Sequence, residues 1–112
     1  MYKLEIIARE EKLGDIIKAL DTIGYPAVTV YTVEGRGHQK GLTQQFRGRT
    51  YEIPFLPKVK IEVLIRDQDY EKVIATVREA ARTGEIGDGK IFVSSVTDVV
   101  RIRTGETGEC AV

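Results

Sequence analysis

The stretch KVKIEVLI, residues 58–65, decides the fold because its apolar residues recur at every second position. A period of two residues is typical of a β-strand that buries one face. The two faces carry Val59, Ile61, Val63 and Ile65 on one side, and Lys58, Lys60, Glu62 and Leu64 on the other. We therefore expect an extended strand over this stretch.

The residues that follow change from a period of two to a helical period. The helix comes after Asp67 and Asp69, either of which is suited to cap it, and is expected to end before Gly84. IFVSSV, residues 91–96, then favours another strand, and VVRIR, residues 99–103, a short extended piece before a polar tail. The apolar helical positions are Tyr70, Val73, Ile74 and Val77.

AVTVYTV, residues 27–33, precedes this stretch in the chain and is rich in β-branched residues. It predicts a strand that neighbours the one described first. Residues 11–23 carry apolar side chains at helical spacing, and Gly24 with Pro26 supplies a stop. Residues 2–8 alternate as a strand does. The apolar helical positions are Leu13, Ile16, Ile17, Leu20 and Ile23.

The resulting order is βαββαβ, the pattern of ferredoxin-like α+β folds, in which two helices cover one face of an antiparallel sheet. A chain of 112 residues is expected to form a single domain, residues 1–112. The other face of the sheet keeps apolar residues that a small domain seldom leaves exposed, so we expect oligomerisation through the sheet. These residues include some of Ile7, Val28, Val30, Leu64 and Val93.

Composition excludes several classes of protein. The chain has 17 basic and 17 acidic residues, so no overall field attracts nucleic acid or an anionic membrane. A single cysteine, Cys110, leaves no internal disulfide framework and fits a reducing compartment. The opening MYKLEIIARE carries charges where a signal peptide needs an apolar run, and no apolar stretch approaches the ~20 residues of a membrane span. We expect a cytoplasmic protein.

Between the second and third strands lies GRGHQKGLTQQFRGRTYEIPF, residues 35–55, a long segment with no sustained period. Structureless loops beyond about 12 to 15 residues are mostly functional or disordered, so a floppy insertion is the alternative. Glycines at the base leave amides free to face an anion, and Phe46 and Tyr51 at the tip suit a protein partner. The basic residues of this loop are Arg36, Lys40, Arg47 and Arg49, against one acid, Glu52.

TGEIGDGKIFV, residues 83–93, fits the phosphate-loop spacing G-x-x-x-x-G-K through Gly84, Gly89 and Lys90. That motif continues with Ser or Thr and joins a strand to the helix that follows it. Here Ile91 comes next, and the glycines follow a helix and precede a strand. If this loop binds phosphate, it does so in another way.

Arg101 and Arg103 lie two apart on the expected extended piece, so their guanidinium groups would point to the same side. With Gly87, Gly89 and Lys90, and with the glycines of the loop base, they offer groups for a phosphate from three segments. Two plainer interpretations stay open: IGDGK as a helix-to-strand turn, and the arginines as a solvated strand face.

In combination, these blocks resemble the PII signal-transduction proteins, nitrogen-regulatory trimers that sense ATP, ADP and 2-oxoglutarate. ARTGEIGDGKIFV is similar to the C-terminal signature of that family, RIRTGETGE to its closing segment, and GRGHQKG and FLPKVKIE to the flanks of its long T-loop. The resemblance covers the whole chain. It implies a homotrimer with nucleotide sites between subunits, a T-loop at about 36–54, a B-loop at about 83–90 and a C-terminal segment at about 101–112.

The resemblance also implies roles for single residues. Those expected at the nucleotide phosphates are Gly87, Asp88, Gly89, Lys90, Arg101 and Arg103, with Gly35, Gly37 and Gln39 from the loop base; those expected at the adenine are Ile7, Thr29, Glu62 and Leu64. For 2-oxoglutarate they are Lys58 at the distal carboxylate, Arg9, the amides of Lys40 and Gly41, and Gln39, which would help hold a Mg²⁺ ion shared with ATP. A dianionic acid beside a triphosphate requires both a metal and a lysine to offset repulsion.

Such a protein would be a sensor and not an enzyme: ATP with Mg²⁺ would build the 2-oxoglutarate site, and ADP would favour another T-loop shape. The implied partners are an ammonium channel, whose mouth Arg47 would enter, or an enzyme of nitrogen metabolism, and a membrane would be met only through such a channel. The tip reads FRGRTY where modified relatives show Y-[KR]-G-[AS]-[AE]-Y, so uridylylation of Tyr51 stays open. His38 stands where many relatives have a phosphate-binding arginine, and is either solvated or at the phosphate.

Three other classes of protein share some of these features. A nucleotide-hydrolysing enzyme with an atypical phosphate loop would need a nucleophile or water-positioning partner for Asp88 and Glu62, and none is evident. An RNA-binding domain of the same element order requires two or three stacking aromatics on its central strands, and only Phe92 lies in a comparable run. A trimeric scaffold without a nucleotide site would leave the IGDGK glycines and both arginines unexplained.

Overall fold

A computed structural model describes residues 1–37, 43–46, 49–52 and 55–112. The strands are β1 (Tyr2–Arg9), β2 (Thr29–Gly35), β3 (Thr43–Phe46), β4 (Arg49–Glu52), β5 (Leu56–Ile65) and β6 (Lys90–Ser95). The helices are α1 (Leu13–Thr22) and α2 (Tyr70–Ala81), with 3-10 turns at Glu10–Lys12, Asp67–Asp69 and Gly108–Ala111.

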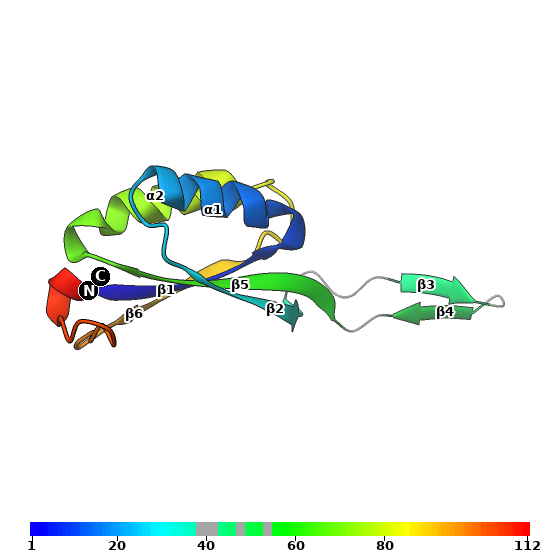
Figure 1. Ribbon diagram of the computed structural model, residues 1–112. Coiled ribbons are helices and arrows are strands. Elements are labelled where there is room, and N and C mark those ends of the chain that lie inside the picture. Colours follow the sequence, from blue (N-terminus) through cyan, green and yellow to red (C-terminus); the bar gives the residue numbers. More distant parts are fainter. Residues whose placement is uncertain (38–42, 47–48, 53–54) are drawn as a thin grey trace.

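The main sheet has the order β2-β5-β1-β6, and each neighbouring pair is antiparallel. Both helices lie on the same face of this sheet (Figure 1). The ferredoxin-like α+β prediction is therefore confirmed. The stretch that alternates most regularly, β5, lies inside the sheet between β1 and β2, which is why its apolar side has to be covered.

The core lies between this sheet and the helices. Ile61 of β5 and Leu4 of β1 are fully buried, and they meet Ile16 and Leu20 of α1 and Val77 of α2 from the other layer. Burying one such side chain contributes about 1.5–3 kcal/mol. The apolar positions predicted from the two periods are those that build this core.

One expected helix cap has another use. Asp69 stands at the N-cap position of α2, but its side chain makes no capping hydrogen bond there. Its carboxylate instead accepts the hydroxyl of Tyr25, which in turn accepts the amide of Arg66. A largely buried tyrosine needs a partner for its hydroxyl, and that demand takes the aspartate away from the helix amides.

The prediction of an apolar helix-free face holds for only part of its residues. Ile7 and Leu64 point away from the helices, whereas Val30 and Val93 pair opposite buried Ile61 and Leu4 and so lie on the helix side. Val28 also packs against the core. Val30 and Val93 are 43% and 41% exposed because they lie on the two edge strands, where helix cover ends.

The helix-free face is largely ionic at its centre. Lys3 pairs with Glu5 at 3.1 Å, and Lys60 lies 3.6 Å from Glu5 and 3.5 Å from Glu62. The Lys60 ammonium also lies 5.2 Å from the centre of the Tyr31 ring. This face therefore offers alternating charges to whatever covers it, beside the apolar residues Ile7 and Leu64 that were expected there.

The expected extended piece at residues 99–103 is wrong. Val100 forms an isolated bridge with Thr107, and the chain between them reverses (Figure 1). The amide of Arg101 donates to the carbonyl of Glu106 at 2.8 Å, and the amide of Gly105 donates back to Arg101 at 2.8 Å. Gly105 has a φ of 74°, a conformation that favours glycine and closes the turn. We call residues 100–107 the C-terminal hairpin.

The long loop contains two short strands that the sequence did not predict. β3 and β4 pair with each other in a separate two-stranded sheet. Strands of 4 residues, TQQF and RTYE, are too short and too polar to display a period of two. The predicted ligand residues His38, Gln39, Lys40 and Gly41, and the partner residue Arg47, lie outside the described residues.

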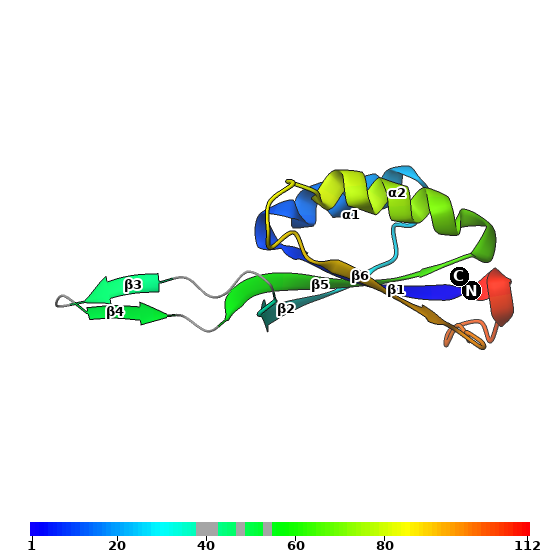
Figure 2. The same ribbon diagram turned by 180° about the vertical axis from the view of Figure 1, so that it is seen from behind.

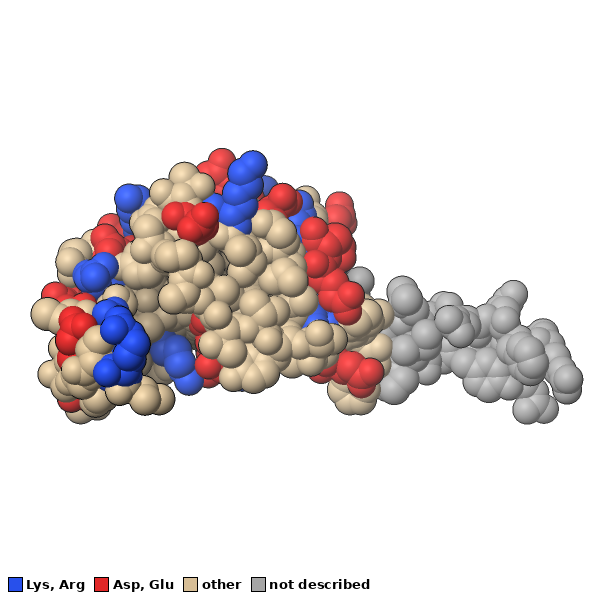
Figure 3. Space-filling view, viewed as in Figure 1, with Lys and Arg blue, Asp and Glu red and all other residues tan. Residues whose placement is uncertain are grey.

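Charges of both signs are interspersed over the face drawn in Figure 3. That distribution agrees with the neutral composition. Among the described residues, no helix is long and apolar enough to span a membrane.

Candidate functional site

A cavity of about 670 Å³ opens where the end of β2, the start of β5 and the end of β1 meet residues 82–89, the α2–β6 loop. These segments are far apart in the sequence and lie at one end of the sheet (Figure 2). The predicted site residues that line the cavity are Ile7, Gly35, Gly37, Lys58, Gly87, Asp88, Gly89 and Lys90. The structure thus brings together the loop-base glycines, the IGDGK glycines and two of the predicted cations.

Gly89 fits its position only as glycine. A Cβ atom there would lie 1.7 Å from the carbonyl oxygen of Ile7, and the backbone φ is 97°. Residues with a side chain rarely adopt that φ, and the oxygen belongs to a strand that pairs with β6. The glycine therefore lets the α2–β6 loop come flush against β1, which places Lys90 at the first position of β6.

The carboxylate of Asp88 organises this loop from within. It accepts the amides of Thr83 and Gly84, each at 2.9 Å, and the hydroxyl of Thr83. Arg9, at the end of β1, donates its Nε to the same carboxylate at 3.1 Å. These donors, first of all the Thr83 hydroxyl, hold the pKa of Asp88 far below its ordinary value, so the group stays ionised.

Two cations from the sheet hold the loop from outside. Besides Asp88, Arg9 donates its Nη2 to the carbonyl of Ile86 at 2.9 Å. Lys58 of β5 is only 8% exposed, and its Nζ donates to the carbonyl of Gly87 at 2.6 Å. Burial, followed by the nearby charge of Arg9, lowers the pKa of Lys58. A carboxylate that reached Lys58 would favour its charged form and so offset this lowering of the pKa.

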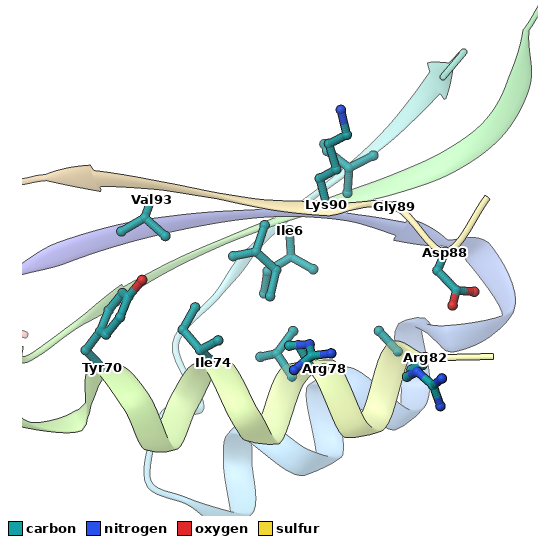
Figure 4. A pocket seen from close by; sticks show the side chains of 13 residues that line it. Ile6, Tyr70, Ile74, Arg78, Arg82, Asp88, Gly89, Lys90 and Val93 are labelled. Atoms are coloured by element: carbon teal, nitrogen blue, oxygen red, sulfur yellow. The ribbon is translucent and has the colours of Figure 1, made fainter. Parts of the chain in front are cut away.

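A second, neighbouring cavity of about 450 Å³ lies on the helix side, between α2 and β6. In Figure 4, Tyr70 and Ile74 point from α2 toward the sheet, Val93 points down toward the helix, and Lys90 points to the opposite side of the sheet. Its floor is mostly apolar, and the Lys90 ammonium is turned toward the first cavity. Arg78 and Arg82 also line this cavity, so it too offers positive charge, but the loop-base glycines are not part of its lining.

Five of the residues predicted for the nucleotide, Thr29, Glu62, Leu64, Arg101 and Arg103, lie away from the first cavity. Thr29 is paired with Glu62 across β2 and β5, and Leu64 with Lys3 across β5 and β1. Arg101 and Arg103 belong to the C-terminal hairpin, which lies at the opposite end of the sheet from the α2–β6 loop (Figures 1 and 2). Within one chain, the predicted nucleotide residues thus form two separate groups.

Arg101 is held within its own hairpin, where its Nη1 lies 3.4 Å from Glu106. The expectation that Arg101 and Arg103 share one side of an extended strand does not hold, because residues 102–104 form a turn. At the other predicted contact surface, Phe46 and Tyr51 lie on β3 and β4.

Sequence reasoning missed several residues of the cavity. Thr83, in the loop beside the cavity, was not singled out, although Thr and Asp side chains in turns commonly bond to nearby backbone groups. Leu56, Ile86 and Phe92 add apolar surface to the wall, and no local pattern marked them. Ile86 and Phe92 are 66% and 53% exposed.

Among the described residues, no group of three or more His, Cys, Asp or Glu side chains is placed to hold a metal ion. The predicted Mg²⁺ residue, Gln39, lies outside them. The cavity lining includes three cations that suit an anion, Arg36, Lys58 and Lys90, beside the acids Glu85 and Asp88.

Fold and cavity together define a small ferredoxin-like domain with a cavity between the glycines of two loops, lined by Lys58 and Lys90. The profile of the family Nitrogen regulatory protein P-II matches residues 1–106. The chain belongs to this P-II family.

Relatives match along the entire chain. It is 50% identical over 112 residues to nitrogen regulatory protein P-II 2 of Methanothermobacter thermautotrophicus, covering 100% of this chain and 97% of that protein. It is 51% identical to nitrogen regulatory protein P-II of Rhizobium meliloti, with both chains covered fully. The crystal structure of Arabidopsis thaliana PII bound to citrate matches with a TM-score of 0.81 at 45% identity, over 99% of this chain and 91% of that one. The chain is thus a signalling regulator of the nitrogen-regulatory class.

Proposed function

We propose that this protein is a cytoplasmic sensor of nitrogen, carbon and energy status that binds ATP or ADP and 2-oxoglutarate and regulates target proteins through the T-loop, residues 36–54. The observation that carries the proposal is the convergence of three separated segments on one cavity, with Gly35 and Gly37 facing Gly87, Gly89 and Lys90. Glycines let backbone amides approach a phosphate closely, and the lysine supplies charge.

The nucleotide site is proposed to lie between two copies of the chain in a homotrimer. Ile7, Gly87, Gly89 and Lys90 lie at the cavity of one copy. The remaining predicted contacts, Thr29, Glu62, Leu64, Arg101 and Arg103, lie elsewhere on the same chain, so a neighbouring copy would supply them. Asp88 lies at the loop and His38 outside the described residues. This division of the predicted residues is what a site shared between subunits requires.

The site for 2-oxoglutarate is proposed next to the phosphates. Lys58 and Arg9 both donate to backbone carbonyls of the α2–β6 loop at this end of the sheet, and the citrate bound to Arabidopsis PII is likewise a small polycarboxylate. Lys58 would pair with the distal carboxylate, assisted by Arg9 and the amides of Lys40 and Gly41. Gln39 would hold a Mg²⁺ ion, which when bound supplies positive charge between the phosphates and the acid.

The T-loop would carry the signal to a partner, either an ammonium channel or an enzyme of nitrogen metabolism. Phe46, Arg47 and Tyr51 lie along this segment, and Tyr51 is the candidate for modification. Ligand binding at the loop base would select among loop shapes, a coupling of typically about 1–3 kcal/mol. Relatives bear the names of regulatory proteins, which agrees with a sensor and not an enzyme.

Titration calorimetry with ATP, ADP and 2-oxoglutarate, with and without Mg²⁺, tests this proposal. We expect both nucleotides to bind, and 2-oxoglutarate to bind only when ATP and Mg²⁺ are present. Lys58→Ala should weaken 2-oxoglutarate at least about tenfold, as expected for a lost charge-assisted pair. Lys72→Ala, which removes an exposed lysine of α2, serves as the control. Binding of 2-oxoglutarate that is equally tight without ATP would contradict the shared site.

A further inference from the structure

We propose that Asp88 is a positioning residue that strengthens anion binding at the α2–β6 loop although it carries a negative charge itself. The inference rests on the proposed nucleotide site and names a residue that acts there through the loop, without touching phosphate. An aspartate beside a phosphate ordinarily repels it. The contacts of Asp88 give the opposite expectation.

Both carboxylate oxygens of Asp88 are occupied by donors of the protein itself. One accepts the Thr83 hydroxyl and the Arg9 Nε, and the other accepts the amides of Thr83 and Gly84. The Asp88 side chain is 25% exposed and that of Arg9 is 17% exposed, so the pair is partly withdrawn from solvent. The negative charge is thereby compensated before any ligand arrives.

These contacts fix the course of the loop. The carboxylate ties residue 88 back to residues 83 and 84, which turns the chain on itself. Arg9 joins that turn to the carbonyl of Ile86 at 2.9 Å, and Lys58 holds the carbonyl of Gly87 at 2.6 Å. With these carbonyls drawn to cations at the sheet, the loop is set before binding. A loop that is already ordered loses less conformational entropy when a ligand binds, which favours binding.

Glu85 provides a matched comparison within the same loop. It lines the same cavity, but it is exposed and makes no ion pair or side-chain hydrogen bond among the described residues. Neutralising either acid removes one negative charge close to the proposed phosphates. Direct electrostatics predicts that both changes tighten nucleotide binding. If Asp88 positions the loop, neutralising Asp88 should weaken nucleotide binding, whereas neutralising Glu85 should strengthen it.

The test compares Asp88→Asn with Glu85→Gln by calorimetric titration of ATP and ADP. We expect Asp88→Asn to weaken both nucleotides about tenfold, in line with the loss of hydrogen bonds to a charged group, and Glu85→Gln to bind them at least as tightly as the wild type. Equal or tighter binding by Asp88→Asn overturns the proposal. Failure of the wild-type chain to bind any nucleotide would instead remove the proposed function.

Amide hydrogen exchange separates positioning from a direct contact. We expect the amides of Thr83 and Gly84 to exchange faster in ligand-free Asp88→Asn and to keep their wild-type rates in Glu85→Gln. Weaker binding with unchanged exchange would overturn the positioning role. If Asp88→Asn does not fold, Thr83→Val removes one donor and keeps every charge, and it should show the same two effects at smaller size.

A double-mutant cycle provides the last check. Arg9→Gln and Asp88→Asn break the same contact, so the double variant should bind ATP no more than about twofold weaker than the worse single variant. If the losses in ATP affinity of the two single variants multiply in the double variant, the two side chains act separately. That result would contradict positioning of the loop by the contact between Arg9 and Asp88.

Discussion

The α2–β6 loop and the C-terminal hairpin are both glycine-containing turns with cations, and both were predicted to meet a phosphate. They are built in different ways. The loop is fixed by residues from other elements, since Arg9 of β1 and Lys58 of β5 donate hydrogen bonds to its carbonyls. The carbonyl oxygen of Ile7 also lies against Gly89. The hairpin is fixed by its own residues, through Arg101 and Glu106, and presents Ile102 99% exposed at its tip.

This contrast indicates which turn is complete within one chain. The loop already has its charges compensated and its backbone pinned by the core sheet. The hairpin carries two arginines and a fully exposed isoleucine with no core beneath them, which is the form of an element that serves a neighbouring molecule. The loop is thus the half of the proposed site that a single chain can build.

The largest expected effect comes from adding one methyl group to each turn. Gly89→Ala forces a Cβ to within 1.7 Å of the Ile7 oxygen at a φ of 97°, so we expect a loss of about 2–5 kcal/mol in unfolding free energy. Gly105→Ala meets nothing within 4 Å and carries only the strain of a φ of 74°, about 1–2 kcal/mol. Urea denaturation of both variants measures the difference. Equal losses would mean that the loop is no more tightly held than the hairpin.

Next in size is a test of whether the two turns meet across copies. Lys90→Ala, directly after the loop at the start of β6, and Arg101→Ala in the hairpin should each weaken ATP binding about tenfold, because each removes a cation from the proposed phosphate site. In a refolded equimolar mixture, a loop from the second variant can meet a hairpin from the first. About one quarter of the sites should then recover wild-type affinity in a randomly mixed ring.

Calorimetry of the mixture resolves that tight fraction from the weak one. The homogeneous variants refolded alone are the controls, since they contain no intact pair. If mixing restores no tight sites, the loop and the hairpin do not serve one ligand across a subunit boundary.

A feature of this structure can be predicted from the sequence when residues close together along the chain determine it. The period of two at residues 58–65 and the helical spacing at Ile16, Leu20, Val73 and Val77 are local, so the element order and the core follow from them. The hairpin was not predicted because VVRIR, residues 99–103, is rich in β-branched residues and indicated an extended chain. The turn depends on Gly105, which comes after that run.

The candidate site depends on pairings that no local pattern contains. Arg9 and Asp88 lie 79 positions apart and Lys58 and Gly87 lie 29 apart, and only the fold brings them together. The glycines of the loop were identifiable, and the reason that Gly89 must be one, the carbonyl of Ile7, was not. The sequence left open whether Val30 and Val93 lie on the helix-free face, because the pairing with Ile61 and Leu4 that puts them on the helix side is not a local feature.

The smallest effect concerns the carboxylates that the two turns use. Glu106 faces Arg101 at 3.4 Å with side chains that are 44% and 41% exposed, so Glu106→Gln should change the unfolding free energy by no more than about 0.5 kcal/mol at pH 7. Asp88→Asn should cost more, and its cost should depend on pH. The folded-state pKa of Asp88 lies below its ordinary value of 3.8, so ionised Asp88 stabilises the fold fully above that pH.

Below that pH the unfolded chain takes up a proton at Asp88 that the folded chain still refuses, so the wild type should lose stability relative to Asp88→Asn as the pH falls toward the folded-state pKa. Urea midpoints of the wild type and both variants between pH 7 and pH 3 measure this. A gap between wild type and Asp88→Asn that stays constant down to pH 3 would mean that Asp88 is not held in its ionised form by the loop. In that case the two turns would differ in packing alone, and the Thr83, Gly84 and Arg9 contacts would add no electrostatic stability.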